Sequence, residues 1–134
     1  MMTIEGMTTL RSAFGAKETM DRIEAEVRAR GFTIFARIDH AQGATEAGLA
    51  LRPTELLIFG AAKAGTPLMA ENQQIGLDLP LKVLVYEDAE RAVYLSYLRP
   101  RWLAERYGLS TALAQADAMT AAVTAVAVKA TGEG

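Results

Sequence analysis

The residues best suited to chemistry in this 134-residue sequence are few, and the adjacent pair Asp39 and His40 is the most suggestive. A carboxylate can orient an imidazole, and histidine titrates near neutral pH, as general acid–base catalysis requires. His40 is the only histidine in the sequence. Adjacent residues of a strand point to opposite faces, so a structural role for His40 at a strand end is the competing interpretation.

A second candidate is the segment 60–68, which combines two glycines with Lys63 and a Thr66-Pro67 helix start. Free backbone N–H groups at a helix N-terminus can hold an anion. The segment contains no complete glycine-rich phosphate-binding motif. A glycine-permitted turn into a helix capped by Thr66 is therefore the simpler interpretation.

Asp78 lies between two leucines just before a predicted strand, where partial burial would raise the pKa of its carboxyl group. Aspartate is also a habitual turn residue, so capping of a turn is the alternative. The chain thus offers two site hypotheses. One is a ligand site formed by His40, Lys63, Thr66 and Asp78, and the other is general acid–base catalysis by His40 with Asp39 or Asp78 as its partner.

Composition excludes several classes of function. The formal net charge is −2, and no stretch clusters lysine and arginine, so nucleic-acid binding is not expected. The absence of cysteine and the single histidine argue against a metal site, and no cofactor is expected. The N-terminus lacks the pattern of a secretory signal. The most apolar stretch, 118–128, would span only about 17 Å as a helix. We therefore expect a cytoplasmic protein without a membrane span.

The elements that must position these residues follow from hydrophobic spacing. Apolar residues recur at helical spacing from 16 to 30, with Gly31 as the stop signal. From Phe32 onward apolar and polar residues alternate, which is typical of a half-buried strand. His40 is an even number of residues after Phe32 and Ile34, so in a regular strand its side chain would point to the same face as theirs. We therefore expect His40 to lie at the end of the strand on the core-facing side.

The rest of the chain continues in the same way. A short helix is predicted at 44–49, and the apolar run 56–59 predicts a central strand with both faces covered. We then expect a helix from Pro67 to about 73, a hairpin of strands 81–86 and 93–98, a helix from Pro100 to about 108, and a final helix over about 110–129, capped by Ser110.

This order, β-α-β-(α)-β-α-β-β-α, predicts an α+β fold with an antiparallel or mixed sheet and helices packed on one face. Long crossover helices do not alternate strictly with the strands, so a doubly wound parallel sheet is disfavoured. No repeat or long linker divides the sequence. We expect a single domain over residues 1–134.

Several segments, taken in order, resemble the family known as domain of unknown function 302. They are GFTIFARIDH (31–40), AGL (47–49), LLIFG (56–60), KAGTPLM (63–69) and LDLPLKVLVYED (77–88), extended by Tyr97, Pro100, Trp102 and Leu103. The resemblance covers about 7–109. It implies a fold like that of the TATA-box-binding protein, frequent dimers and no established activity. Many members have Asn-Pro where this chain has Ala61-Ala62.

The leading expectation is a binding module for a small molecule or a partner, forming a homodimer. General acid–base catalysis is one alternative. A purely structural or dimerisation domain is another, with the alanine-rich C-terminal helix as its docking element.

Overall fold

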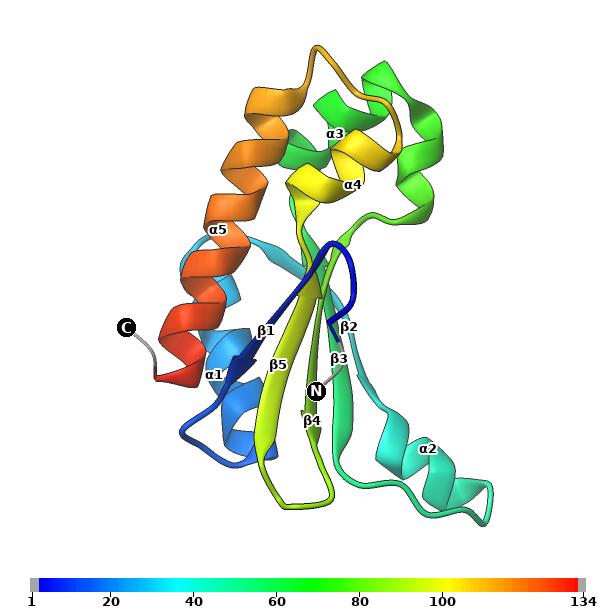
Figure 1. Cartoon of the computed structure of the whole chain (residues 1–134), viewed down its shortest axis with the longest axis vertical. Coiled ribbons are helices and arrows are strands. Elements are labelled where there is room, and N and C mark those ends of the chain that lie inside the picture. Colours follow the sequence, from blue (N-terminus) through cyan, green and yellow to red (C-terminus); the bar gives the residue numbers. More distant parts are fainter. Residues whose placement is uncertain (1–2, 133–134) are drawn as a thin grey trace.

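The computed structural model describes residues 3–132 and contains a five-stranded antiparallel sheet in the order β1-β5-β4-β3-β2 (Figure 1). The strands are β1 (Met7–Arg11), β2 (Thr33–Asp39), β3 (Thr54–Gly60), β4 (Leu81–Glu87) and β5 (Val93–Leu98). The helices are α1 (Ala16–Ala29), α2 (His40–Glu46), α3 (Ala62–Glu71), α4 (Pro100–Arg106) and α5 (Leu113–Thr131), with a 3₁₀ helix, η1 (Gln73–Leu77). The domain predicted over 1–134 includes residues 1, 2, 133 and 134, which lie outside the described range.

The predicted element order and the α+β class are confirmed. Helix α1 forms where the apolar spacing places it, and Met20, Ile23 and Val27 are fully buried along one side. The β4–β5 hairpin is also confirmed. Its turn is closed by Asp88, whose carboxylate accepts the backbone N–H groups of Glu90 and Ala92.

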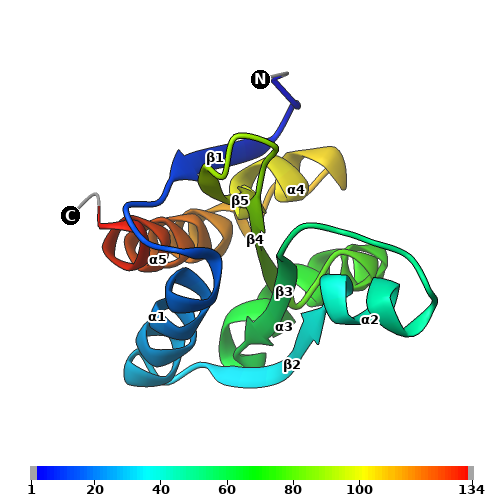
Figure 2. The ribbon, with the colours of Figure 1, turned by 90° about the horizontal axis from the view of Figure 1, so that it is seen from below.

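The sheet is covered on one side. Helices α1 and α5 lie against the same face, as the end-on view shows (Figure 2). The core between them and the sheet contains Leu57, Phe59, Val83, Val85 and Leu95, all at most 1% exposed. On the opposite face, which we call the open face, Leu56, Ile58 and Leu84 are only partly buried. The expectation that β3 is covered on both sides is therefore wrong.

Three helices begin at other residues than predicted. Helix α2 starts at His40 instead of residue 44 and ends at Glu46 instead of residue 49. Helix α3 starts at Ala62, and Pro67 lies inside it, so Thr66 is not its N-cap. The preceding alanines favour helix and override Pro67, which is the sixth residue of α3 and has no backbone N–H to donate. Ser110 does not cap α5, because the preceding backbone N–H groups are bound by the carboxylate of Glu71.

The alanine-rich stripe of α5 is buried within its own chain. Ala116, Met119, Val123 and Val126 are at most 5% exposed, and the helix packs against α1 and α4. Small side chains allow this close approach. The stripe is therefore not available as a docking element for another chain.

Candidate functional site

His40 does not face the core. A bulge in β2 separates the pairs Ile34–Phe59 and Ala36–Ile58, so the alternation shifts by one residue beyond it. Arg37 thereby turns toward α1, and His40 is exposed as the first residue of α2. The predicted core-facing position of His40 is wrong for this reason.

The structure pairs His40 with neither predicted partner. The carboxylate of Asp39 accepts the backbone N–H of Gln42 at 2.9 Å and caps α2. Asp78 directly follows η1, and helices α2 and α3, which precede and follow β3 in the chain, lie at opposite ends of the sheet (Figure 1). The two ends of the seven-residue strand β3 are roughly 20 Å apart. General acid–base catalysis by His40 with Asp39 or Asp78 has no geometric basis here.

Of the four residues predicted to bind a ligand, His40 lies at one end of the sheet, and Lys63, Thr66 and Asp78 lie near the opposite end. Lys63 and Thr66 are exposed on α3, at the end of the sheet away from His40. Asp78 accepts a short hydrogen bond of 2.5 Å from the hydroxyl of Tyr107, and this bond raises the pKa of the tyrosine. The backbone carbonyl of Asp78 accepts the Lys82 ammonium at 3.3 Å. The carboxylate of Asp78 thus links the end of η1 to Tyr107, the residue after α4, and its predicted role in capping a turn stays a prediction.

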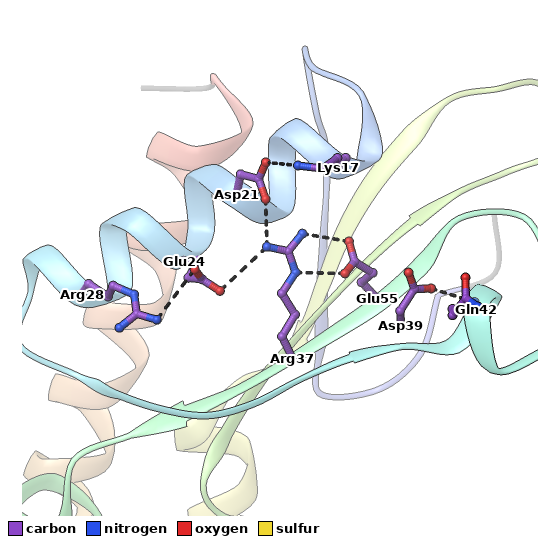
Figure 3. A network of polar contacts seen from close by, with 8 residues as sticks. All are labelled: Lys17, Asp21, Glu24, Arg28, Arg37, Asp39, Gln42 and Glu55. Carbon is purple, nitrogen blue, oxygen red and sulfur yellow. Dashed lines mark hydrogen bonds and ion pairs between the residues drawn. The ribbon is translucent and has the colours of Figure 1, made fainter.

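The bulge in β2 creates a polar network that sequence reasoning missed (Figure 3). The Arg37 guanidinium donates to both carboxylate oxygens of Glu55, at 2.9 and 3.0 Å, and to Asp21 at 2.8 Å. Lys17 donates to the other oxygen of Asp21 at 2.8 Å. These bonds tie the start of α1 to β2 and β3.

The network borders a hollow of about 520 Å³ between α1 and the ends of β2, β3 and β4. Its two cations, Lys17 and Arg37, are already paired with carboxylates. The pKa of Asp21 is lowered, mainly by its hydrogen bond with Lys17 and also by the one with Arg37. The pKa of Arg37 is raised, mainly by its hydrogen bonds with Glu55 and also by the one with Asp21. The charged groups of this network pair with one another, which favours a structural role.

The strongest candidate site is an apolar cavity of about 260 Å³ beside α3, which we call the α3 cavity. One part of its wall consists of residues with little or no side chain, namely Gly60, Ala61, Ala62, Ala64 and Gly65. The other part consists of larger apolar residues, namely Phe32, Phe35, Met69, Leu79, Pro80, Leu81 and Met119. No lining residue carries a charge, so this cavity suits an apolar molecule.

Polar contacts around the cavity fix its walls. Glu71, the last residue of α3, accepts the backbone N–H groups of Ser110, Thr111 and Ala112 at 2.6 to 2.9 Å. These bonds, led by that of Ser110, lower the pKa of Glu71 to about 2. The next residue, Asn72, donates its side-chain N–H to the carbonyl oxygen of Tyr107 at 3.0 Å. Helix α3 is thus tied to the start of α5.

Sequence reasoning treated the small-residue run 60–65 as a turn and missed the cavity. A run of glycine and alanine supplies little side-chain volume, but small residues also permit close packing, as in α5, so the run alone could not reveal the cavity. The sequence also does not show that Phe35 and Met119 line the cavity. Strand and helix patterns predict the elements that contain these two residues but not the contacts of those elements with α3.

Residues 3–132 contain neither a metal-binding cluster nor a membrane-spanning helix. No three histidine or acidic side chains in this range are grouped so that they could hold a metal ion. No helix in the same range combines the length and the apolar composition needed to cross a membrane.

Comparison with known proteins gives a family for the sequence and a solved structure with the same fold. The family described as "Domain of unknown function DUF302" matches residues 8–126. A crystal structure of an uncharacterised conserved DUF302 protein from Bacillus stearothermophilus superposes with a TM-score of 0.85 at 20% identity. The superposition covers 95% of this chain and 99% of the other, and it shows that the two share a fold.

Two curated relatives are proteins named "Fluoride-specific ion channel FluC 1", from Brucella suis biovar 1 and Brucella abortus biovar 1. Each is 45% identical to this chain over 104 residues, which is 78% of this chain. The match covers 41% and 38% of the two relatives. The chain therefore spans about two fifths of the length of these relatives.

Proposed function

Since this chain belongs to the DUF302 family, a family of unknown function, we propose that it is a non-enzymatic domain that binds a small apolar molecule in the α3 cavity. The observation that carries the proposal is the cavity itself, about 260 Å³ in volume with a wholly apolar set of side chains. The hollows beside α1 and on the open face are larger, at about 520 and 400 Å³, but charged side chains line both of them.

The volume sets the size of the ligand. A cavity of about 150 Å³ lined by apolar side chains accepts benzene, so 260 Å³ corresponds to a molecule of roughly ten non-hydrogen atoms. Burial of such a molecule removes its apolar surface, and that of the wall, from water.

The segments that resemble the family meet at this cavity. Gly60, Met69 and Leu81 lie in three of them, and all three residues line the wall. Lys63 and Thr66 lie on α3, the helix that contributes Met69 to the wall. Asp78 directly precedes the lining residue Leu79. We propose that the ligand site is centred on this wall rather than on His40. The likeness to the TATA-box-binding protein stays a prediction.

Methionine methyl groups give a local readout of binding. In a chain labelled at the methionine methyl carbons, 4-ethylphenol should shift the NMR signals of Met69 and Met119, which line the cavity. The signals of Met7, on β1, and of Met20, in the core beneath α1, should stay in place. Shifts confined to Met7 or Met20 would place binding elsewhere.

A cavity-filling variant completes this test. Ala64→Leu adds bulk at the wall and should weaken binding at least about tenfold, because the ligand and the new side chain compete for one space. Ala70→Leu is the matched control, since Ala70 is exposed on the same helix and does not line the cavity. Equal affinity of the two variants would refute the proposal, provided that thermal unfolding shows both to be folded.

The named relatives favour a second function. We propose that this domain also contacts a fluoride channel, because it is 45% identical to a segment of proteins with that name. The surface suited to such contact is the open face. Ile4 and Leu51, which are 50% and 51% exposed, border a hollow of about 400 Å³ on this face. Ile38 is 38% exposed and pairs with Leu56, so its side chain lies on the same face.

Fluoride efflux tests this second function. The chain is added to liposomes that contain a fluoride channel lacking this domain, and efflux is followed with a fluoride electrode. The rate should change with the wild-type chain and with Leu77→Glu, but not with Ile38→Glu. Leu77 is the control because it is 85% exposed and belongs to η1, outside the strands that form the open face. The contradicting result is an efflux rate that the wild-type chain does not change. If light scattering then shows a dimer that Ile38→Glu disrupts, the open face serves self-association instead.

A further inference from the structure

We propose that the ligand of the α3 cavity is a flat aromatic molecule, and that Phe35 selects it by covering its face where the cavity meets solvent. This inference rests on the proposed function and names the class of ligand. It starts from the position of Phe35, which lines the cavity and is nevertheless 58% exposed.

The bulge in β2 is what places Phe35 there. Ile34 pairs with Phe59 and Ala36 pairs with Ile58, so Phe35 has no partner residue on β3. Bulges commonly re-aim a side chain in this way. The Phe35 ring therefore lies at the rim of the cavity and not in the core or on the open face of the sheet.

Gly60 leaves room for that ring. An atom added at the Cβ position of Gly60 would lie 3.7 Å from a ring carbon of Phe35 and 3.3 Å from Cβ of Pro80. The Phe35 ring therefore lies close to the bare backbone of Gly60, and Pro80 lies close to the same point. The missing side chain is therefore what allows Phe35 and Pro80 to approach this point, and the ligand would lie on the cavity side of the Phe35 ring.

The inner wall also suits an aromatic ligand. Phe32 lines the cavity and is held edge-on to the buried Phe59, with ring centroids 5.5 Å apart and an interplanar angle of 76°. The thioethers of Met69 and Met119 are polarisable and make favourable contacts with aromatic rings. A saturated ring of equal size is puckered and offers neither stacking nor a flat edge.

The test uses two ligands with the same number of non-hydrogen atoms, 4-ethylphenol and 4-ethylcyclohexanol. Each is titrated into the full chain, and Kd is read from the methionine methyl signals of Met69 and Met119. In the wild-type chain 4-ethylphenol should bind more tightly. In Phe35→Leu that preference should fall roughly three- to tenfold, because leucine keeps apolar bulk but cannot stack. Phe35→Tyr, which keeps the ring, should retain the preference.

The outcomes separate this inference from the proposed function. If both ligands bind with equal affinity and Phe35→Leu changes neither Kd, the cavity binds apolar molecules but the aromatic selection by Phe35 is wrong. If neither ligand shifts Met69 or Met119, the proposed function itself fails. Because Phe35 is more than half exposed, its substitution should leave the fold intact, and thermal unfolding checks this.

Discussion

The carboxylate of Glu71, at the end of α3, accepts the backbone N–H of Ala112, the residue before α5, at 2.8 Å. The two residues are 41 positions apart in the sequence. Through this contact one side chain caps a helix to which it does not belong. The same contact joins the helices that contribute Met69 and Met119 to the α3 cavity.

Acid should weaken this contact. The folded-state pKa of Glu71 is about 2, below its ordinary value of 4.5, so the stabilisation is present above pH 4.5 and is lost as the pH falls toward 2. Glu71→Gln should therefore lower Tm at neutral pH and reduce the steepness of the fall in Tm between pH 4.5 and 2. Calorimetric scans across this range measure both effects. The exposed Glu46→Gln serves as control, and an equal change in it would contradict the assignment.

Arg37 should be the most important ion-pairing residue of the sheet. Its side chain is 24% exposed and that of Glu55 is 19% exposed, so their two-bond contact is partly shielded from water. We expect Arg37→Met to lower the free energy of unfolding by about 1–2 kcal/mol. Urea titration is the suitable measurement, because guanidinium chloride would itself screen the charges. Arg28→Met should cost under about 0.5 kcal/mol, since Arg28 is 64% exposed and lies 3.7 Å from Glu24.

Gly6 should tolerate no side chain. Its φ is +80°, and a Cβ atom there would overlap the indole ring of Trp102. Gly31 has a similar φ of +82° but nothing within 4 Å of its Cβ position, so Gly31→Ala isolates the backbone cost. Gly6→Ala should therefore destabilise the fold by about 1–3 kcal/mol more than Gly31→Ala in denaturant titrations. Trp102→Leu in the Gly6→Ala background should recover part of the difference, and its failure to do so would argue against the clash.

Gly65→Ala should stabilise the chain. Gly65 lies within α3, and an added Cβ would meet Met69 and Leu79 at 3.7 and 3.8 Å, which are ordinary contact distances. We expect a gain of about 0.5–1 kcal/mol in the free energy of unfolding, from the lower entropy of the unfolded chain. Gly76→Ala is the comparison, because its Cβ would lie only 3.2 Å from the sulfur of Met69 and should gain less. Equal gains at both positions would show that contact distance does not decide the effect.

Local patterns were sufficient to predict most of the fold. The apolar stripe of α1 and the alternation in the β4–β5 hairpin each depend on neighbouring residues, and both were correct. The start of α3 was predicted wrongly because Thr66-Pro67 is a strong local start signal that the helix-favouring alanines before it override.

The candidate site was harder to predict because its parts come from distant segments. A bulge of one residue between Ile34 and Ala36 reverses the faces of Arg37 and His40, and no residue type in β2 marks that bulge. The cap of α5 comes from Glu71, so no local motif before the helix could reveal it. Contacts of this kind depend on the tertiary fold alone.

The place of β1 at the edge of the sheet also affects how the chain reaches its fold. Within residues 3–132 its only partner strand is β5, and the outermost register pair, Met7 with Leu98, is separated by 91 residues of chain. During synthesis at about 5–20 residues per second, β1 therefore waits on the order of ten seconds for its partner to leave the ribosome. Strands β2, β3 and β4 can pair earlier, over shorter separations that close more quickly. The first strand made is thus the last that can join the sheet.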